Sequence, residues 1–218
     1  MAFLRRSAGT VTQRTLDSPI LTTPALGTPA SGEISGIQDG WVHILTKSVN
    51  NGNSLSINAS DGWTTTTYPQ NWIEMTNFSD FSSNEQLSMY VEYNGSFDEA
   101  STTNYRYHVT EQRSSSNAMV EFNSGSTAAI RISGYDTRNT NYVYGSMNMY
   151  CNKFNALSRQ QFWWTFSHSL VSSGASLLST GIGGYDPSSH TVTGVKFWMT
   201  SSGTYDATFK VFGSNVGA

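Results

Sequence analysis

In residues 87–93, Leu-Ser-Met-Tyr-Val-Glu-Tyr, every second side chain is large and apolar, beginning with Leu87. Such period-two alternation predicts a β-strand with one buried and one solvated face, as in antiparallel sheets. Residues 118–122 (AMVEF), 195–199 (VKFWM) and 205–212 (YDATFKVF) repeat the pattern. These stretches indicate that the chain is built from half-buried strands.

Polar turn signals separate the predicted strands, as Asn51-Gly52, Asp61-Gly62, Asn94-Gly95 and Ser124-Gly125 do. The predicted strands are 41–47, 54–59, 71–77, 87–93, 105–111, 118–123, 128–133, 142–150, 161–167, 191–200 and 205–212. Glycines 174, 181, 183 and 184 predict a loop region that includes one helical turn over 175–179. This spacing predicts an all-β fold, an antiparallel two-sheet sandwich of jelly-roll type.

The composition excludes several classes of protein. The chain has 218 residues, of which 12% are charged and 13% aromatic, while 33 Ser, 25 Thr and 17 Asn make up about a third of it. The aromatic content can build a core, so wholesale disorder is excluded. No apolar run is long enough to span a bilayer, and a net charge of −3 provides no basic field for nucleic acid. We expect neither a membrane nor a nucleic acid as partner.

Few residues suggest catalysis or cofactor binding. The single Cys151 forbids an internal disulfide and a Cys-based metal site, and it is interpreted as a small buried residue. The four histidines have no metal-ligand spacing, and no phosphate-binding glycine loop or nucleophile elbow is present. A glycan hydrolase would need two carboxylates about 5–10 Å apart. Candidates are Asp98, Glu99, Glu111, Glu121 and Asp136, but Asp98-Glu99 reads as a solvated turn. We expect no enzyme activity, cofactor or metal.

The distribution of aromatic residues divides the chain near residue 40. No Phe, Tyr or Trp lies between Phe3 and Trp41, whereas all the others lie from Trp41 onward. Because a core needs large apolar groups, residues 1–40 are predicted to be an arm and residues 41–218 an outer domain. The arm is interpreted either as a flexible linker or as a segment that becomes ordered on a partner surface.

Prolines set the expected conformation of the arm. Pro19, Pro24 and Pro29 recur every five residues, each after Ser or Thr, and this favours an extended chain. Arginines make the tip cationic, which suits an acidic patch on a partner, and apolar residues between the prolines could fill shallow grooves. The predicted attachment residues are Arg5, Arg6, Arg14, Pro19, Ile20, Leu21, Pro24, Leu26 and Pro29.

Aromatic side chains supply the remaining candidate sites. Trp63, Tyr135 and Tyr185 lie near loop glycines and are candidate glycan contacts through ring stacking; the alternative for each is the core or a subunit interface. Adjacent bulky pairs, as at 163–164 and 197–198, must point to opposite faces of a strand. One of each pair then faces outward, and we predict that Trp164 and Trp198 lie at a subunit interface.

A resemblance appears in the arm. Residues 15–32, TLDSPILTTPALGTPASG, resemble a segment that recurs in tailed-bacteriophage virion proteins, in tail fibres and in small head-decoration proteins. Residues 193–199 and 208–213 are similar to the last hairpin of phage surface domains. The resemblance implies a non-enzymatic virion component, commonly a homotrimer, that attaches by an N-terminal arm and presents a β-rich domain outward.

Two functions are therefore expected, and a third ranks behind them. The first is a trimeric capsid cement or decoration protein whose arm clamps the major capsid protein. It is favoured because one arm leads into one domain without a repeated shaft. The alternative is a tail fibre or receptor-binding protein that attaches to a tail protein and recognises a host surface glycan; a virion-attached glycan hydrolase ranks last. Because the N-terminus shows no secretion signal, we expect assembly in the host cytoplasm and a final location in the virion.

Overall fold

The computed structural model describes most of the chain beyond the predicted arm. The described residues are 40–63, 68–80, 86–93, 95–99, 104–114, 119–133, 143–152, 160–170, 175–186, 192–200 and 203–214. All of them belong to one unit of the chain, Asp39–Ala218. The predicted attachment residues lie outside the described residues: Arg5, Arg6, Arg14, Pro19, Ile20, Leu21, Pro24, Leu26 and Pro29. The extended arm therefore stays a prediction.

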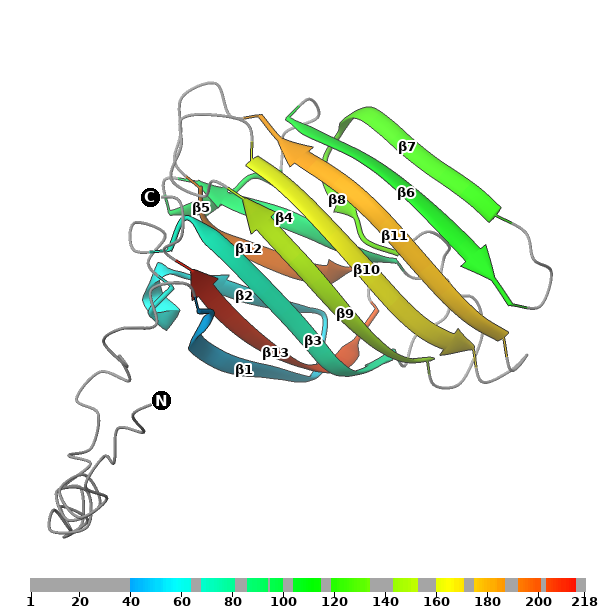
Figure 1. Ribbon diagram of the computed structural model, residues 1–218, viewed down its shortest axis with the longest axis horizontal. Coiled ribbons are helices and arrows are strands. Elements are labelled where there is room, and N and C mark those ends of the chain that lie inside the picture. Colours follow the sequence, from blue (N-terminus) through cyan, green and yellow to red (C-terminus); the bar gives the residue numbers. More distant parts are fainter. Residues whose placement is uncertain are drawn as a thin grey trace, which may run out of the picture. The chain divides into compact units, whose positions relative to one another are not determined.

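The described residues form thirteen strands in two antiparallel sheets (Figure 1). The larger sheet has eight strands. In spatial order they are β1 (Val42–Gly52), β13 (Tyr205–Ser214), β3 (Gln70–Asp80), β9 (Val143–Asn152), β10 (Gln160–Leu170), β11 (Ala175–Tyr185), β6 (Tyr105–Arg113) and β7 (Met119–Thr127). Strands that are neighbours in this sheet are therefore often far apart in the sequence, as β1 and β13 are.

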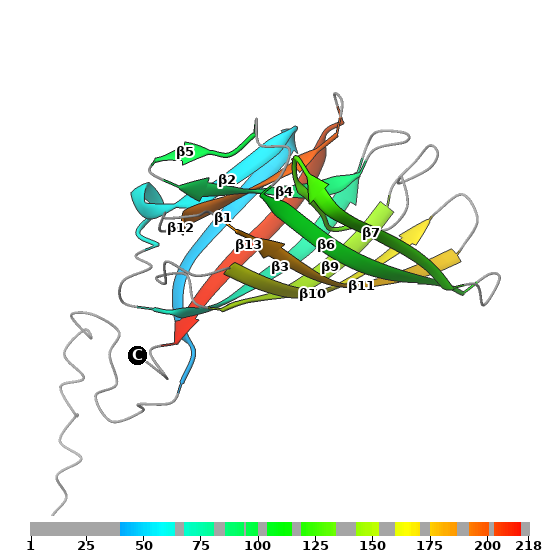
Figure 2. The same ribbon diagram turned by 90° about the horizontal axis from the view of Figure 1, so that it is seen from above.

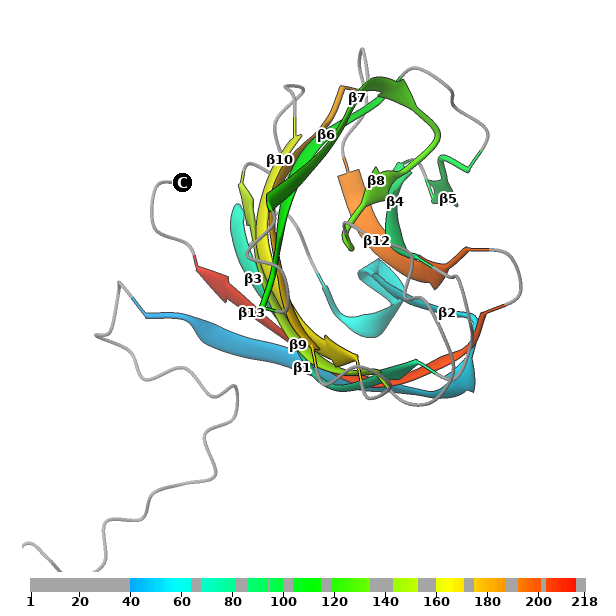
Figure 3. The same cartoon turned by 90° about the vertical axis from the view of Figure 1, so that its right-hand side faces the viewer.

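The smaller sheet covers one face of the larger one (Figures 2 and 3). Its strands, in order, are β2 (Ser54–Asn58), β12 (Val192–Met199), β4 (Leu87–Tyr93) and β5 (Ser96–Phe97), and β8 (Ile130–Arg131) also pairs with β4. One short 3-10 helix, η1 (Ala59–Asp61), follows β2. Figure 3 shows the larger sheet curving around the smaller one. The prediction of an antiparallel two-sheet sandwich of jelly-roll type is confirmed.

The inner faces of the two sheets meet in one apolar core. The rings of Phe197 on β12 and Phe209 on β13 are stacked with their centroids 4.9 Å apart. The Tyr205 hydroxyl donates a hydrogen bond to the Phe197 carbonyl oxygen at 3.2 Å, and burial raises its pKa. Most of the inward residues predicted from alternation are buried: Leu87, Met89, Val91, Val195, Phe197, Met199, Tyr205, Ala207, Phe209 and Val211. Tyr93, Val120 and Phe122, which the same pattern predicts to face inward, are only half-buried, and Ala118 lies outside the described residues.

A buried carboxylate joins the sheets at one end of the core. Asp98 follows β5, and its Oδ2 accepts hydrogen bonds from the Tyr185 hydroxyl at 3.0 Å and from Asn104 Nδ2 at 2.9 Å. The Tyr105 hydroxyl donates to the Asp98 carbonyl oxygen and accepts from the Val91 N–H, each at 3.0 Å. Burial and Asp98 raise the pKa of Tyr185 well above its usual value. The interpretation of Asp98 as part of a solvated turn is therefore wrong.

The predicted loop over the glycines is a central strand. The eleven residues of β11 pair along their length with β10, and nine of them pair with β6. The helical turn expected over 175–179 is therefore wrong, and Ser124-Gly125 also lies inside a strand, β7, rather than in a turn. Glycine suggested loops at both places because it disfavours strands in general. In β11 its lack of a side chain provides room for a neighbour.

That neighbour is Trp164. Its indole fills the core with 2% of its surface exposed, and its Nε1 donates to the Ile132 carbonyl oxygen at 3.0 Å. Gly181 lies directly opposite on β11, and a Cβ there would overlap the indole ring. A Cβ on Gly183 would lie 3.2 Å from the same ring. The indole therefore occupies space that two glycines leave empty.

We predict that Gly181→Ala lowers the free energy of unfolding by about 1–3 kcal/mol, because the added methyl group overpacks the Trp164 site. Urea denaturation followed by far-UV circular dichroism measures the change. The matched control is Gly184→Ala on the same strand, where a Cβ would meet only the Gln160 carbonyl oxygen at 3.5 Å. That control should be as stable as the parent or slightly more stable. Equal stability of the two variants would contradict the packing described here.

Candidate functional site

A row of outward side chains crosses the uncovered face of the eight-stranded sheet. Each member is paired in register with the next, so that the row runs straight across all eight strands. We call it the outer row: His43, Phe212, Trp72, Tyr150, Trp163, Ile182, His108 and Asn123. Five members are aromatic or aliphatic, which is unusual for a face that no other element of the described chain covers.

Ring contacts order the aromatic part of the outer row. Trp72 stacks on Phe212 with centroids 4.9 Å apart and on Tyr150 at 6.1 Å, and Trp41 meets the edges of Trp72 and Tyr150 at 6.2 Å. The Trp72 indole N–H donates to Asn148 Oδ1 at 3.1 Å, which fixes the ring. Such contacts hold aromatic side chains in place while leaving faces and edges open to solvent.

Much of the outer row is exposed. Tyr150 is 47% exposed, Trp163 39% and Ile182 53%. Polar rows lie on both sides of it, two residues along each strand except on β1, where a register shift makes the separation from His43 to Thr46 three residues. One side carries Ser214, Gln70, Asn152, Gln161, Gly184 and Arg106; the other carries Thr46, Lys210, Glu74, Asn148, Thr165, Thr180, Thr110 and Glu121. An apolar strip bordered by amides and hydroxyls combines ring stacking with hydrogen bonding, as small-molecule sites do.

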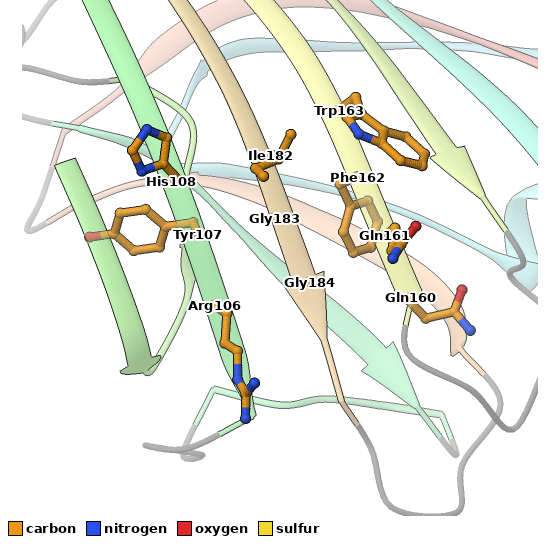
Figure 4. Close-up of a pocket in the computed structure, with 10 residues that line it drawn as sticks. All are labelled: Arg106, Tyr107, His108, Gln160, Gln161, Phe162, Trp163, Ile182, Gly183 and Gly184. Atoms are coloured by element: carbon orange, nitrogen blue, oxygen red, sulfur yellow. The ribbon is translucent and has the colours of Figure 1, made fainter. Parts of the chain in front are cut away.

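A hollow of about 360 Å³ opens on this face around Gly184 (Figure 4). Gly184 lies between Gln161 on β10 and Arg106 on β6, and no side chain fills the space between those two residues. Trp163 and Ile182 border the hollow on the side of the outer row. We call this depression the Gly184 hollow. Its volume lies near the lower end of the range for small-ligand pockets.

The electrostatics of the Gly184 hollow come from one side chain. Arg106 is the only residue lining it with a fixed charge, and no Asp or Glu among the described residues lines it. Within the described part of the chain, neither the Arg106 guanidinium nor the Gln161 amide has a hydrogen-bond or ion-pair partner. The hollow is therefore weakly cationic, and its strongest donor is unpaired.

A second, smaller hollow of about 150 Å³ lies beside the first. It is bordered by Trp41, Gln70, Tyr150, Asn152 and Trp163. Trp163 thus separates two depressions on one face, each with an aromatic wall and at least one amide. Together they form a shallow track across β3, β9, β10, β11 and β6, about 20 Å long at the usual strand spacing.

The glycan contacts predicted at loop glycines are wrong for two residues of three. Trp63 is fully buried, and its Nε1 donates to Asn71 Oδ1 at 2.8 Å. It follows Gly62, whose φ of +86° turns the chain back into the core. Tyr185 is 1% exposed and is held by Asp98 and the Tyr105 ring. Neither ring can stack on a sugar, while Tyr135 lies outside the described residues.

The two tryptophans predicted to lie at a subunit interface are found in different environments. Trp164 points into the core, so its assignment to an outward interface is wrong, and its neighbour Trp163 faces outward instead. Trp198 lies half-buried on the outer face of the smaller sheet, where it stacks on Tyr90 with centroids 5.1 Å apart and planes 8° apart. Its place at a subunit interface stays a prediction.

The alternation of residues along β10 contained the information that Trp163 faces outward. Alternate residues Phe162, Trp164 and Phe166 are all aromatic, whereas the set that includes Trp163 otherwise holds Gln161, Thr165 and Ser167. The apolar set faces the core in the structure. Counting both sets of the strand would have assigned each tryptophan to the correct face, whereas the pair alone could not.

Several of the remaining reactive groups are buried or lie apart from this face, whereas the candidate carboxylate Glu121 lies exposed in one of its polar rows. Cys151 is buried, as expected, and burial raises its thiol pKa. Glu111 is buried and accepts a hydrogen bond from the Ser179 hydroxyl at 3.0 Å, while exposed Glu99 pairs with Lys196 at 2.6 Å. Among the described residues, no group of three His, Cys, Asp or Glu side chains is arranged to hold a metal. Nor is any described helix long and apolar enough to cross a membrane.

Comparison with protein-family models, curated proteins and solved structures found no match to this chain. The geometry of the described residues alone therefore defines the candidate site. It offers exposed rings, neighbouring amides, two shallow hollows and one guanidinium that has no partner among the described residues, and these groups can bind a ligand by ring stacking and hydrogen bonding.

We predict that replacing the two adjacent tryptophans lowers the free energy of unfolding by very different amounts. Trp164→Ala should lower the free energy of unfolding by about 3–5 kcal/mol, because it leaves a cavity in the core. Trp163→Ala should lower it by less than about 1 kcal/mol, because that ring lies on the surface. Denaturant titration of both variants measures the difference. Similar losses in both would mean that the two faces of β10 are wrongly assigned.

Proposed function

We propose that the chain is a non-enzymatic structural component of a bacteriophage virion, a trimeric capsid decoration protein attached through its N-terminal arm. The observation that carries the proposal is the change in composition at Trp41. The segment before it resembles a virion-protein arm, and the first strand of the sandwich, β1, begins at Val42. The aromatic content that builds the core therefore starts where the resemblance to an attachment segment has ended.

The described site supports a division of labour between the two parts. The described part of the sandwich has a closed apolar core, with Asp98 and Trp164 buried inside it. We propose that residues 1–40 bind the major capsid protein. The sandwich is then free to present its uncovered sheet face away from the shell.

A second role is favoured by a specific observation. A receptor-binding protein of the tail needs an exposed recognition surface, and the outer row with its two hollows is such a surface. Copy number separates the two roles. Quantitative gel analysis of purified virions should give hundreds of copies for a decoration protein, and a few dozen at most for a tail protein.

We predict that deleting residues 1–36 abolishes incorporation into particles and leaves the melting temperature of the outer domain almost unchanged. The arm has no aromatic residue after Phe3 and therefore lacks most of the large rings from which a core of this kind is built. Differential scanning calorimetry measures the melting temperature, and sedimentation with arm-free virions measures incorporation. The full chain, added to the same particles, is the control. Normal occupancy by the truncated protein would place the attachment surface on the sandwich instead.

We predict that the full chain in solution is a stable homotrimer, with three times the 23.9 kDa mass of one chain. Trp198 is proposed to lie in the contact, because this half-buried ring sits on the outer face of the smaller sheet. An obligate contact should bury at least about 2,000 Å². Light scattering at micromolar concentration gives the mass, and a monomer would contradict the prediction. Trp198→Ala should weaken the trimer, whereas Tyr144→Ala, an exposed ring on the larger sheet, should not.

A further inference from the structure

We propose that the Gly184 hollow binds an acidic sugar unit of a polysaccharide, with the sugar ring against Trp163 and its carboxylate on Arg106. The inference rests on the second of the two proposed roles and names the ligand class for it. Its test reads only the chemistry of one described face, so its failure can be distinguished from a failure of attachment to the virion.

The platform is Trp163. Its ring is 39% exposed and lies on a strand in the middle of the sheet, so the backbone beneath it is fixed by pairing on both sides. An aromatic face carries partial negative charge, which attracts the C–H groups on the flat side of a pyranose ring. Ile182 beside it extends the apolar surface by one strand. The area suits a flat ring, whereas a point-like ion would leave it unused.

The floor is the backbone at Gly184. Because this residue has no side chain, a ligand can sit between Gln161 and Arg106, whose strands are separated by β11 alone. At the usual strand spacing those two backbones are about 10 Å apart, and Trp163 lies about 7 Å along β10 from Gln161. A space of that size admits one pyranose ring. The Gln161 amide can both donate to and accept from sugar hydroxyls.

The charge decides which sugar fits. The Arg106 guanidinium is exposed and unpaired among the described residues, and it is the only fixed charge that lines the hollow. Guanidinium and carboxylate groups form paired hydrogen bonds of matching geometry. A neutral sugar would leave this donor to water. The site therefore favours a uronate- or sialate-type unit over an uncharged one.

The length of the track points to a polymer. The second hollow continues the same face on the other side of Trp163, with Trp41 and Tyr150 as walls and Asn152 as an amide. A single sugar would fill one hollow only. A chain of several units could contact Trp163 with one unit, Tyr150 with the next, and an amide with each. Repeated weak contacts of this kind raise overall affinity without a deep pocket.

The test is affinity electrophoresis of the full chain in native gels. The gels contain polygalacturonate, alginate or polysialate, and each polymer is titrated to obtain a dissociation constant. Highly methyl-esterified pectin is the matched neutral probe, because it has the backbone of polygalacturonate with most carboxylates masked. We expect at least one acidic polymer to retard the protein about tenfold more strongly than its neutral counterpart, with the effect weakening as salt rises.

Four variants locate the site. Trp163→Ala should weaken binding of the acidic polymer about tenfold or more, while Trp163→Tyr, which keeps a ring, should retain most of it. Arg106→Gln should remove the preference for acidic over esterified polymer. Gly184→Val should block binding, because its side chain would fill the hollow. The variant should still fold, because a Cβ at this position makes only an ordinary contact and valine suits a strand. Each variant is first checked for the parent's circular dichroism spectrum and unfolding midpoint.

The aromatic control is Tyr144→Ala. Tyr144 is 59% exposed on the same face of β9, six residues from Tyr150 and hence about 20 Å from the outer row. Its removal should leave binding unchanged. The inference is overturned if none of the three acidic polymers binds better than neutral pectin. It is also overturned if Gly184→Val binds like the parent, or if Tyr144→Ala loses as much as Trp163→Ala. None of these results bears on attachment of the arm, which is read from particle incorporation.

Discussion

The inward and outward facing of side chains in the larger sheet depends on the fit of the Trp164 indole over Gly181, in the middle of that sheet. Side chains of a strand alternate, so fixing one residue inward fixes the facing of every other residue on that strand. Residues paired across neighbouring strands face the same side of the sheet, so the facing of β10 also sets the facing of β9 and β11. A slip of one residue would turn Trp164 to the outer face and would turn the polar set of β10, with Gln161, Thr165 and Ser167, toward the core. The packing of Trp164 in the core therefore also determines which residues of these strands face outward in the outer row.

Local alternation was sufficient to predict the fold class and most strands. The stretch 87–93 became β4, in which Leu87, Met89 and Val91 are buried as expected, although Ser88 and Glu92 on the opposite face are buried too. The odd-numbered residues of β13 are buried as the pattern required. The strand β11 could not be predicted in the same way, because Gly181 and Gly183 leave room for the indole of Trp164, a side chain on a different strand. That contact joins residues distant in the sequence, and a local pattern contains no information about it.

The site was harder to predict than the fold for a related reason. Proximity to glycine suggested that Trp63 and Tyr185 lie on the surface, yet Gly62 directs Trp63 inward and Asp98 holds the Tyr185 hydroxyl inside. The outer row is assembled from eight strands, and each contributes one residue that is unremarkable in its own segment. Only the order of strands, with β13 between β1 and β3, brings Phe212 beside Trp72. Exposure of a ring can be inferred from one strand, but its neighbours cannot.

The order of the strands also determines when the domain can be completed during synthesis. Among the described strands, β1 pairs in its sheet with β13 alone, and β13 comes last of them in the sequence. Until residue 214 has left the ribosome, β1 and the inner edge of β3 lack the strand that joins them. The nascent chain therefore carries exposed strand edges for most of its synthesis, a situation that favours pairing with other chains. Closure of the sheet is the final, non-local step, which topologies of this kind reach slowly.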